Sequence, residues 1–321
     1  MSGIRCERIA LPDPVGGQDV PALRLTNPSG IELIAVPSRA LDIYSLRYQG
    51  ESISYTNRAA GISPAHFSEN GIEGFQGNFF AGMVTTCGLI QSGRPCAENG
   101  RKFGLHGCIS NTPSESLTIE ENEDSIIISA IVNEMHTEGE RMELSRRLIL
   151  SRSADVRIED CVTNRGQAGT PFMMMYHINF GAPFLSEGMD FELPFQYVED
   201  RDTGAAASAD AARRICGEGA SANEKVYYTR ADLRHGAALT NRKLNIACRL
   251  TAEGEDLQWT GIWQSYVQGK YALGIEPCNC PGLGRVQAAA RGLLPHLAPG
   301  ESRRHSIHLH FEEIVRERED A

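Results

Sequence analysis

The chain is dominated by a hydrophobic period of two, which is typical of half-buried β-strands. Residues 116–134 (SLTIEENEDSIIISAIVNE) alternate on both sides of an acidic turn and predict a strand, a turn and a second strand. The segments 142–151 and 154–164 continue the pattern. Both faces of the segment 154–164 mix polar and apolar residues, so the period alone does not settle which face is buried.

More strands are predicted in the second half of the chain. Gln268-Gly269 joins the segments 256–267 and 270–279 in a hairpin-like connection. Pro299-Gly300 forms a turn before a closing strand in which 306–311 alternate. The central segments are 243–252, 256–267 and 270–279.

Helix signals are few. Thr203–Arg214 (TGAAASADAARR) predicts a short helix or a surface loop, since its apolar residues are all small. The glycine-rich stretch from Gly71 to Gly107 predicts long loops and close backbone approaches. Many strands with no repeat, linker or boundary predict an all-β chain: a large antiparallel β-sandwich in one domain, 1–321, with residues 1–30 as N-terminal strands or an arm packing on it.

The composition and charge of the chain limit the classes of molecule that it can be expected to bind. The 321 residues are 41% hydrophobic and 22% charged, an ordinary globular balance, and the net charge of −10 argues against nucleic acid or an anionic membrane. No apolar run approaches the roughly 20 residues of a membrane helix, and no signal peptide is recognisable. The nine cysteines show no disulfide spacing. We therefore expect reduced thiols and a cytoplasmic location.

The first candidate for chemistry is a histidine inside the apolar stretch MMMYHINFG (173–181). Strand alternation places Met175, His177 and Asn179 on one face, with Tyr176 and Ile178 on the other. His177 and Asn179 therefore project together, which suggests a cleft. The alternative is a core histidine that is merely hydrogen-bonded.

Two further residues could act with it. His106 stands in Leu105-His106-Gly107, at a loop-to-strand junction that can point a side chain into a pocket, although such histidines are often structural. Glu276 ends an apolar strand just before Pro277. Burial there would raise its pKa and suit a general base; the alternative is an exposed glutamate at a strand end.

Polar pairs elsewhere are weaker candidates. Arg39 and Asp42 could bond sugar hydroxyls or pair with each other. Cys278-x-Cys280 has the wrong spacing for a usual zinc site, and the HxH pair at 308–310 lacks matching ligands. We expect neither a metal nor a cofactor.

Four segments in order resemble the aldose 1-epimerase (galactose mutarotase-like) family. They are ENGRKFGLHG (98–107), DVRIEDCVTNRGQAGTPFMMMYHINFG (155–181), YALGIEPCN (271–279) and LAPGESRRHSIHLHF (297–311). The resemblance runs from about Ile31 to Phe311. The segments SRALDI and TTCGL look like a divergent branch rather than galactose mutarotase itself.

The resemblance implies a mutarotase-type β-sandwich that interconverts sugar anomers through ring opening. Glu276 would be the base that deprotonates the anomeric hydroxyl, and His177 the acid that protonates the ring oxygen, from opposite sides of the sugar. His106 would hydrogen-bond the sugar and support the developing charge. Imidazole suits this work because its pKa lies near neutral pH.

Further residues are expected to bind the substrate. Trp263 and Gln264 lie on the strand predicted to pair with the Glu276 strand, and an aromatic plane beside polar groups is typical of pyranose recognition. Arg39, Asp42 and Asn179 complete the expected set. For the family's binding aspartate the candidates are Asp42, Asp200 and Asp202.

Other functions remain open at this point. The chain could be a carbohydrate-binding or sensing protein on the same fold, or another sugar isomerase or epimerase using the same acid and base. The presence of both His177 and Glu276 favours an enzyme. The expected partner is a small-molecule carbohydrate, not nucleic acid or a membrane; a homodimer is allowed but not required.

Overall fold

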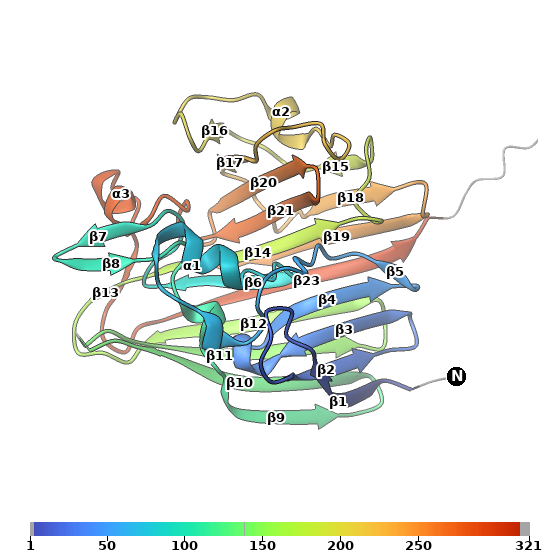
Figure 1. Ribbon diagram of the computed structural model, residues 1–321, viewed down its shortest axis with the longest axis horizontal. Coiled ribbons are helices and arrows are strands. Elements are labelled where there is room, and N and C mark those ends of the chain that lie inside the picture. Colours follow the sequence, from blue (N-terminus) through green and yellow to red (C-terminus); the bar gives the residue numbers. More distant parts are fainter. Residues whose placement is uncertain (1–2, 138, 315–321) are drawn as a thin grey trace, which may run out of the picture.

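Two large antiparallel β-sheets make up most of the protein (Figure 1). The computed structural model describes residues 3–137 and 139–314. Over these residues the first sheet has eleven strands, in the order β1-β2-β3-β4-β6-β14-β21-β20-β17-β16 with β5 beside β4. They are β1 Arg5–Leu11, β2 Val20–Thr26, β3 Ile31–Val36, β4 Asp42–Tyr48, β5 Glu51–Ser52, β6 Val84–Leu89, β14 Met173–Gly181, β16 Val198–Asp200, β17 Lys225–Thr229, β20 Trp259–Val267 and β21 Lys270–Cys278.

The second sheet is formed by eight strands of the described residues, in the order β15-β18-β19-β23-β12-β11-β10-β9. They are β9 Glu115–Glu121, β10 Ser125–Met135, β11 Arg141–Ser151, β12 Asp155–Asn164, β15 Asp190–Glu192, β18 Ala237–Asn241, β19 Ile246–Glu253 and β23 Ser302–Glu313. Two small ribbons pair β7 Cys96–Glu98 with β8 Arg101–Phe103 and β13 Thr170–Pro171 with β22 His296–Leu297.

Helices are short and lie outside the sheets. The α-helices are α1 Gly71–Asn78, α2 Ala209–Arg213 and α3 Arg285–Ala290, and the 3-10 turns are η1 Pro37–Arg39, η2 Pro64–His66 and η3 Ile109–Asn111. None of the helices in the described part of the chain is long and apolar enough to cross a membrane.

The β-sandwich predicted from the sequence is confirmed, and most of its strands lie where the pattern placed them. Residues 116–134 form β9 and β10, and β20 pairs with β21 through a turn at Gln268-Gly269 in which Gly269 takes a φ of +78°. In β12 the buried face is that of Val156, Ile158 and Asp160. Asp160 can face inward because a buried arginine pairs with it.

Some boundaries differ from the prediction. The strand expected at 243–252 starts at Ile246, since the side-chain oxygen of Asn241 accepts hydrogen bonds from the amides of Lys243 and Leu244 and forms a turn. The glycine-rich stretch expected as loops contains a helix, α1, as well as strands. Helix α1 forms despite its glycines because Phe75 packs into an apolar cluster.

The core lies between the two large sheets, and a buried ionic cluster crosses it. Arg146 of β11 bonds Asp42 of β4 at 2.8 Å and both carboxylate oxygens of Asp160 at 2.9 and 2.7 Å. The Tyr176 hydroxyl donates to Asp160 at 2.8 Å. This cluster ties β14 of the first sheet to the second sheet, and removing one partner would leave a buried charge uncompensated.

Strand β14 lies in the middle of the first sheet and is buried on both faces. Tyr176 and Ile178 belong to the core between the sheets, whereas Met175 belongs to a separate apolar cluster on the other face. The alternation predicted from the sequence is therefore confirmed. His177 projects from the face that is turned away from the second sheet.

Candidate active site

A small cleft lies on the outer face of the first sheet, over its central strands. Its floor is formed by residues of β14, β20 and β21, and helix α1 and the loop around His106 cover it. The cleft has a volume of about 70 Å³, which admits the reacting end of one small molecule. Its polar and charged side chains are Gln76, Arg94, His106, His177, Arg201, Glu224, Lys270 and Glu276.

A larger surface hollow, of about 1220 Å³, lies against the second sheet. It is wide, and charged side chains that already pair with one another line it, such as Arg147 with Glu159 and Arg234 with Asp232. The smaller cleft is the better candidate because it holds buried groups that can exchange protons.

His177 and Glu276 meet at the floor of the cleft. They lie side by side on the neighbouring strands β14 and β21, with Nε2 of His177 3.2 Å from Oε1 of Glu276. Their side chains are 6% and 3% exposed. The two groups project from adjacent strands of one sheet and face each other directly. The expectation that they approach the substrate from opposite sides stays a prediction.

Asn179 fixes the orientation of the His177 ring. Its side-chain amide donates to the carbonyls of Ala81 and Gly82, both at 3.1 Å, which leaves Oδ1 turned to Nδ1 of His177 at 2.5 Å. Nδ1 must then carry a proton, and Nε2 faces Glu276. Asn179 itself is fully buried and does not line the cleft, so in this structure its side chain contacts His177 rather than the space open to a ligand.

Glu276 occupies a space kept open by two glycines. A Cβ at Gly261 would collide with Oε2 of Glu276, and one at Gly274 would crowd Oε1. Burial raises the pKa of Glu276, while His177 and Arg201 act in the opposite direction. A carboxylate in this setting is a stronger base than an exposed one.

His106 enters the cleft from the loop above the sheet. Its backbone has a φ of +60°, and Nδ1 accepts a hydrogen bond from the amide of Gly93 at 3.4 Å. Burial lowers the pKa of His106 well below its usual value, with further contributions from His177 and Arg201. The ring is therefore neutral at pH 7, and its Nε2–H is a hydrogen-bond donor.

Trp263 forms a wall of the cleft next to a charged pair. Its indole Nε1 donates to Glu224 at 3.1 Å, and Lys270 donates to the same oxygen at 2.9 Å. The ammonium of Lys270 lies 5.3 Å from the centre of the Trp263 ring. Lys270 and Glu224 were not singled out in the sequence, although Lys270 shares the face of β21 that carries Glu276.

Two arginines line another part of the cleft. Arg94 follows the loop after β6, and Arg201 follows β16. Oδ1 of Asp202 accepts from both, from Nη2 of Arg94 at 2.5 Å and from Nε of Arg201 at 2.9 Å. Neither arginine was predicted, because each stands alone in a loop sequence without a period. Of the candidate binding aspartates, Asp202 is thus next to the cleft.

Three expected binding residues lie away from the cleft. Arg39 is buried and donates to backbone carbonyls, including those of Ile62 and Asn78 at 2.9 Å. Asp42 is buried in the ion pair with Arg146, and burial raises its pKa. Gln264 points to the opposite face of β20 from Trp263 and donates to the carbonyl of Ala212 at 2.7 Å.

Asp200 does not reach the cleft either. Its Oδ1 accepts hydrogen bonds from the amides of Asp202 and Thr203, at 2.9 and 3.0 Å. It therefore closes the turn that presents Arg201.

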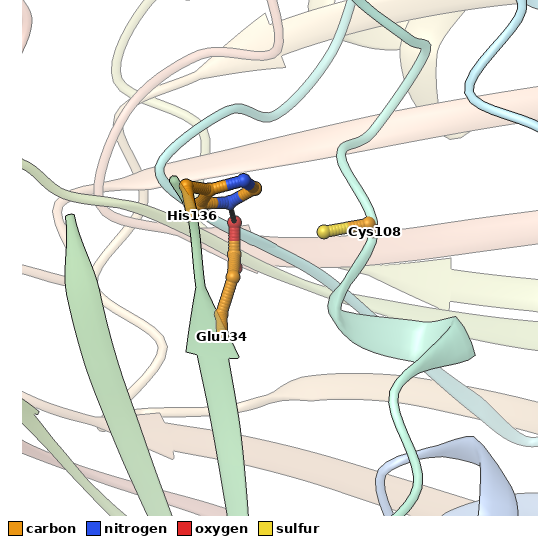
Figure 2. Close-up of side chains that lie close together, drawn as sticks. All are labelled: Cys108, Glu134 and His136. Atoms are coloured by element: carbon orange, nitrogen blue, oxygen red, sulfur yellow. Dashed lines mark hydrogen bonds and ion pairs between the residues drawn. The ribbon is translucent and has the colours of Figure 1, made fainter. Parts of the chain in front are cut away.

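A second polar cluster joins Cys108, Glu134 and His136 (Figure 2). These residue types can bind a metal, but Arg101 donates to Nδ1 of His136 at 2.6 Å, so the proton is on Nε2, which faces Glu134 at 2.9 Å. Neither ring nitrogen then has a lone pair free for a metal. Glu134 also accepts from the amide of Leu89 at 2.6 Å. The cluster is a hydrogen-bonded support for the end of β6.

Solved structures with a similar fold carry sugar-related names. A protein from Klebsiella pneumoniae named "putative aldose 1-epimerase" has a TM-score of 0.83 at 21% identity, over 93% of this chain and 82% of that chain. A galactose mutarotase-like protein from Clostridium acetobutylicum has a TM-score of 0.70 at 13% identity, over 97% and 99%. Galactose 1-epimerase from Lactobacillus acidophilus has a TM-score of 0.62 at 12% identity, over 97% of this chain and 100% of that chain.

These likenesses show the fold, which is the galactose mutarotase-like β-sandwich that the sequence predicted. No curated protein matches the chain in sequence. The family model for a domain of unknown function, DUF4432, matches residues 17–311. The chain therefore belongs to the DUF4432 family.

Proposed function

We propose that the protein is an aldose 1-epimerase that interconverts the anomers of a sugar by opening and closing its ring. The observation that carries the proposal is the contact between His177 and Glu276, with Nε2 and Oε1 3.2 Å apart at the floor of a cleft. The two oxygens that exchange protons in this reaction, the anomeric hydroxyl and the ring oxygen, are bonded to one carbon. An acid and a base that lie side by side fit that arrangement.

The residues divide the proton transfers between them. Glu276 takes the proton of the anomeric hydroxyl while His177, with a proton on each ring nitrogen, gives the Nε2 proton to the ring oxygen and keeps the one on Nδ1, so the bond from the anomeric carbon to that oxygen breaks and an aldehyde forms. Rotation about the next carbon–carbon bond presents the other face of the aldehyde. The freed hydroxyl then attacks, returning its proton to His177 while Glu276 reprotonates the new anomeric oxygen.

Other cleft residues support this chemistry. The neutral His106 offers an Nε2–H donor to an oxygen of the sugar, where negative charge develops. Trp263 offers an aromatic face to the apolar side of a pyranose ring. These groups bind and orient the sugar while the pair at the floor moves the protons.

NMR exchange spectroscopy with a panel of aldoses tests the proposal. At least one aldose should show accelerated exchange between its α and β signals. Glu276→Gln and His177→Asn should each lower that rate by at least about 10²-fold. The matched controls are Glu159→Gln and His310→Asn, which change partly exposed residues of the second sheet, outside the cleft, and should leave the rate unchanged.

Two outcomes would favour other functions. If several sugars bind but none exchanges faster, the protein is a sugar-binding module on this fold. If deuterium from solvent appears on carbon, the same acid and base act in a different isomerase or epimerase.

A further inference from the structure

The cleft has a cationic rim above its catalytic floor. The side chains of Arg94 and Arg201 are 45% and 22% exposed, whereas those of His177 and Glu276 are 6% and 3% exposed. All four line the same small cleft. A molecule whose reacting carbon lies at the floor therefore extends towards the two guanidinium groups.

The charges at this rim do not balance. Lys270 is matched by Glu224, with Nζ 2.9 Å from Oε2. Arg94 and Arg201 share the single carboxylate of Asp202, through one oxygen atom. At the rim two guanidinium groups thus face one carboxylate, and the remaining carboxylate of the cleft, Glu276, lies at its buried floor, where Arg201 lowers its pKa. Two guanidinium groups at the exposed rim favour an anionic ligand there.

The hydrogen-bond donors of the two arginines are also incompletely used. Arg201 donates to Asp202 through Nε, and its Nη1 and Nη2 have no hydrogen-bond partner among residues 3–137 and 139–314. Asp202 holds this guanidinium from one side, so the terminal nitrogens remain available to a ligand. A guanidinium with free donors matches the paired oxygens of a carboxylate, phosphate or sulfonate.

We propose, building on the epimerase function above, that Arg94 and Arg201 bind an anionic substituent of the sugar, so that the substrate is an acidic sugar rather than a neutral aldose. A neutral sugar offers only hydroxyl groups to the two guanidiniums. An oxyanion group accepts charge-assisted hydrogen bonds from both of them.

Binding of an anion at the rim would also act on the base. Arg201 lowers the pKa of Glu276 and of His106 through its charge. An anion on Arg201 offsets this effect and raises the pKa of Glu276, which strengthens the base once the correct sugar is bound. The same subsite would therefore both recognise the anionic sugar and increase the rate of its reaction.

NMR exchange spectroscopy with matched sugar pairs tests the proposal: glucose with glucuronate, galactose with galacturonate, and glucose with glucose 6-phosphate. The acidic member of at least one pair should have a kcat/KM at least about 10-fold higher, the lower range for hydrogen bonds to charged groups. A preference confined to the uronates identifies a carboxylate, and one confined to glucose 6-phosphate a larger oxyanion. Raising the salt concentration should reduce the preference.

Arginine variants locate the subsite. Arg94→Gln and Arg201→Gln should each lower kcat/KM for the acidic sugar by about 10- to 100-fold, and by much less for its neutral partner. Arg147→Gln, which removes an exposed arginine paired with Glu159 on the second sheet, is the matched control and should change neither rate.

Failure of this inference can be told apart from failure of the epimerase function. Equal turnover of acidic and neutral aldoses, or equal losses for both in the arginine variants, overturns the anion subsite and leaves the epimerase standing. If no aldose exchanges faster, the epimerase function fails, and calorimetric titration of glucuronate and glucose 6-phosphate into the wild type and Arg94→Gln decides the subsite. Binding that Arg94→Gln weakens supports it; absent or unaffected binding overturns it.

Discussion

Oδ1 of Asn179 lies 2.5 Å from Nδ1 of His177, and both side chains project from the same face of β14. The amide nitrogen of Asn179 donates to three backbone carbonyls, so the amide cannot turn around without losing them. One asparagine thus decides which nitrogen of the histidine faces the cleft and Glu276. It does so without lining the cleft.

Replacing that asparagine should therefore affect the reaction more than binding. We expect Asn179→Ala to lower kcat by roughly 10- to 100-fold, the range known for partners that orient a metal-binding histidine, because the loss of ring orientation is the same kind of effect. KM should change little because the substrate does not touch Asn179. Steady-state kinetics checks this, and a raised KM with an unchanged kcat would contradict it.

The raised pKa of Glu276 sets the acid side of the pH profile. Glu276 acts as a base only when ionised, and burial holds its pKa above the ordinary value of 4.5. Activity should fall as the pH drops through this raised pKa, at a pH where an exposed glutamate would still be ionised. The pH dependence of kcat/KM reports the value in the free enzyme, and an acid limb at or below 4.5 would refute the assignment.

His106 should make the folded state less stable as the pH falls. Burial lowers its pKa well below 6.5, so between the two pKa values the unfolded chain binds a proton that the folded chain does not. The free energy of unfolding should then fall by up to about 1.4 kcal/mol per pH unit below 6.5 through this group.

Urea unfolding at pH 8.0 and pH 5.5 measures the effect. His106→Asn should reduce the difference between the two pH values, whereas His296→Asn, which changes an exposed histidine, should preserve it. Identical differences in the wild type and His106→Asn would show that His106 does not contribute.

Asp42 should matter for stability rather than for substrate binding. Its carboxylate accepts hydrogen bonds from Arg146 and from both the amide and the hydroxyl of Thr86. Asp42→Asn turns a donor towards groups that also donate, and we expect a loss of about 1–3 kcal/mol in the free energy of unfolding. KM for the sugar should stay the same in the folded variant. A raised KM with unchanged stability would restore Asp42 as a binding residue.

The sequence predicted four residues of the cleft but neither of the arginines at its rim. Strand alternation and motif order indicated His177, Glu276, His106 and Trp263, and the structure brings all four into one cleft. Period two in a strand fixes the face of every side chain, so a residue on a recognisable strand can be placed.

The same pattern could not locate the remaining residues. Asp42 seemed suited to a sugar, but its partner Arg146 lies 104 positions away, on the other sheet. Arg94 and Arg201 meet only because two loops 108 residues apart share Asp202. Lys270 could have been predicted from the sequence, since it lies six residues before Glu276 on the same face of β21. Contacts between distant loops follow from tertiary packing, which leaves no local periodic signal.

The place of β14 in the molecule bears on which parts of the cleft can change independently of the core. The residue next to His177, Tyr176, is bonded into the ionic cluster between the sheets, so a shift of the strand would disturb His177 and the core together. Arg94 and Arg201 instead lie in loops, outside the strands of the two large sheets. If the proposed function holds, exchange of these two side chains could alter the choice of substrate while the strands beneath keep their arrangement.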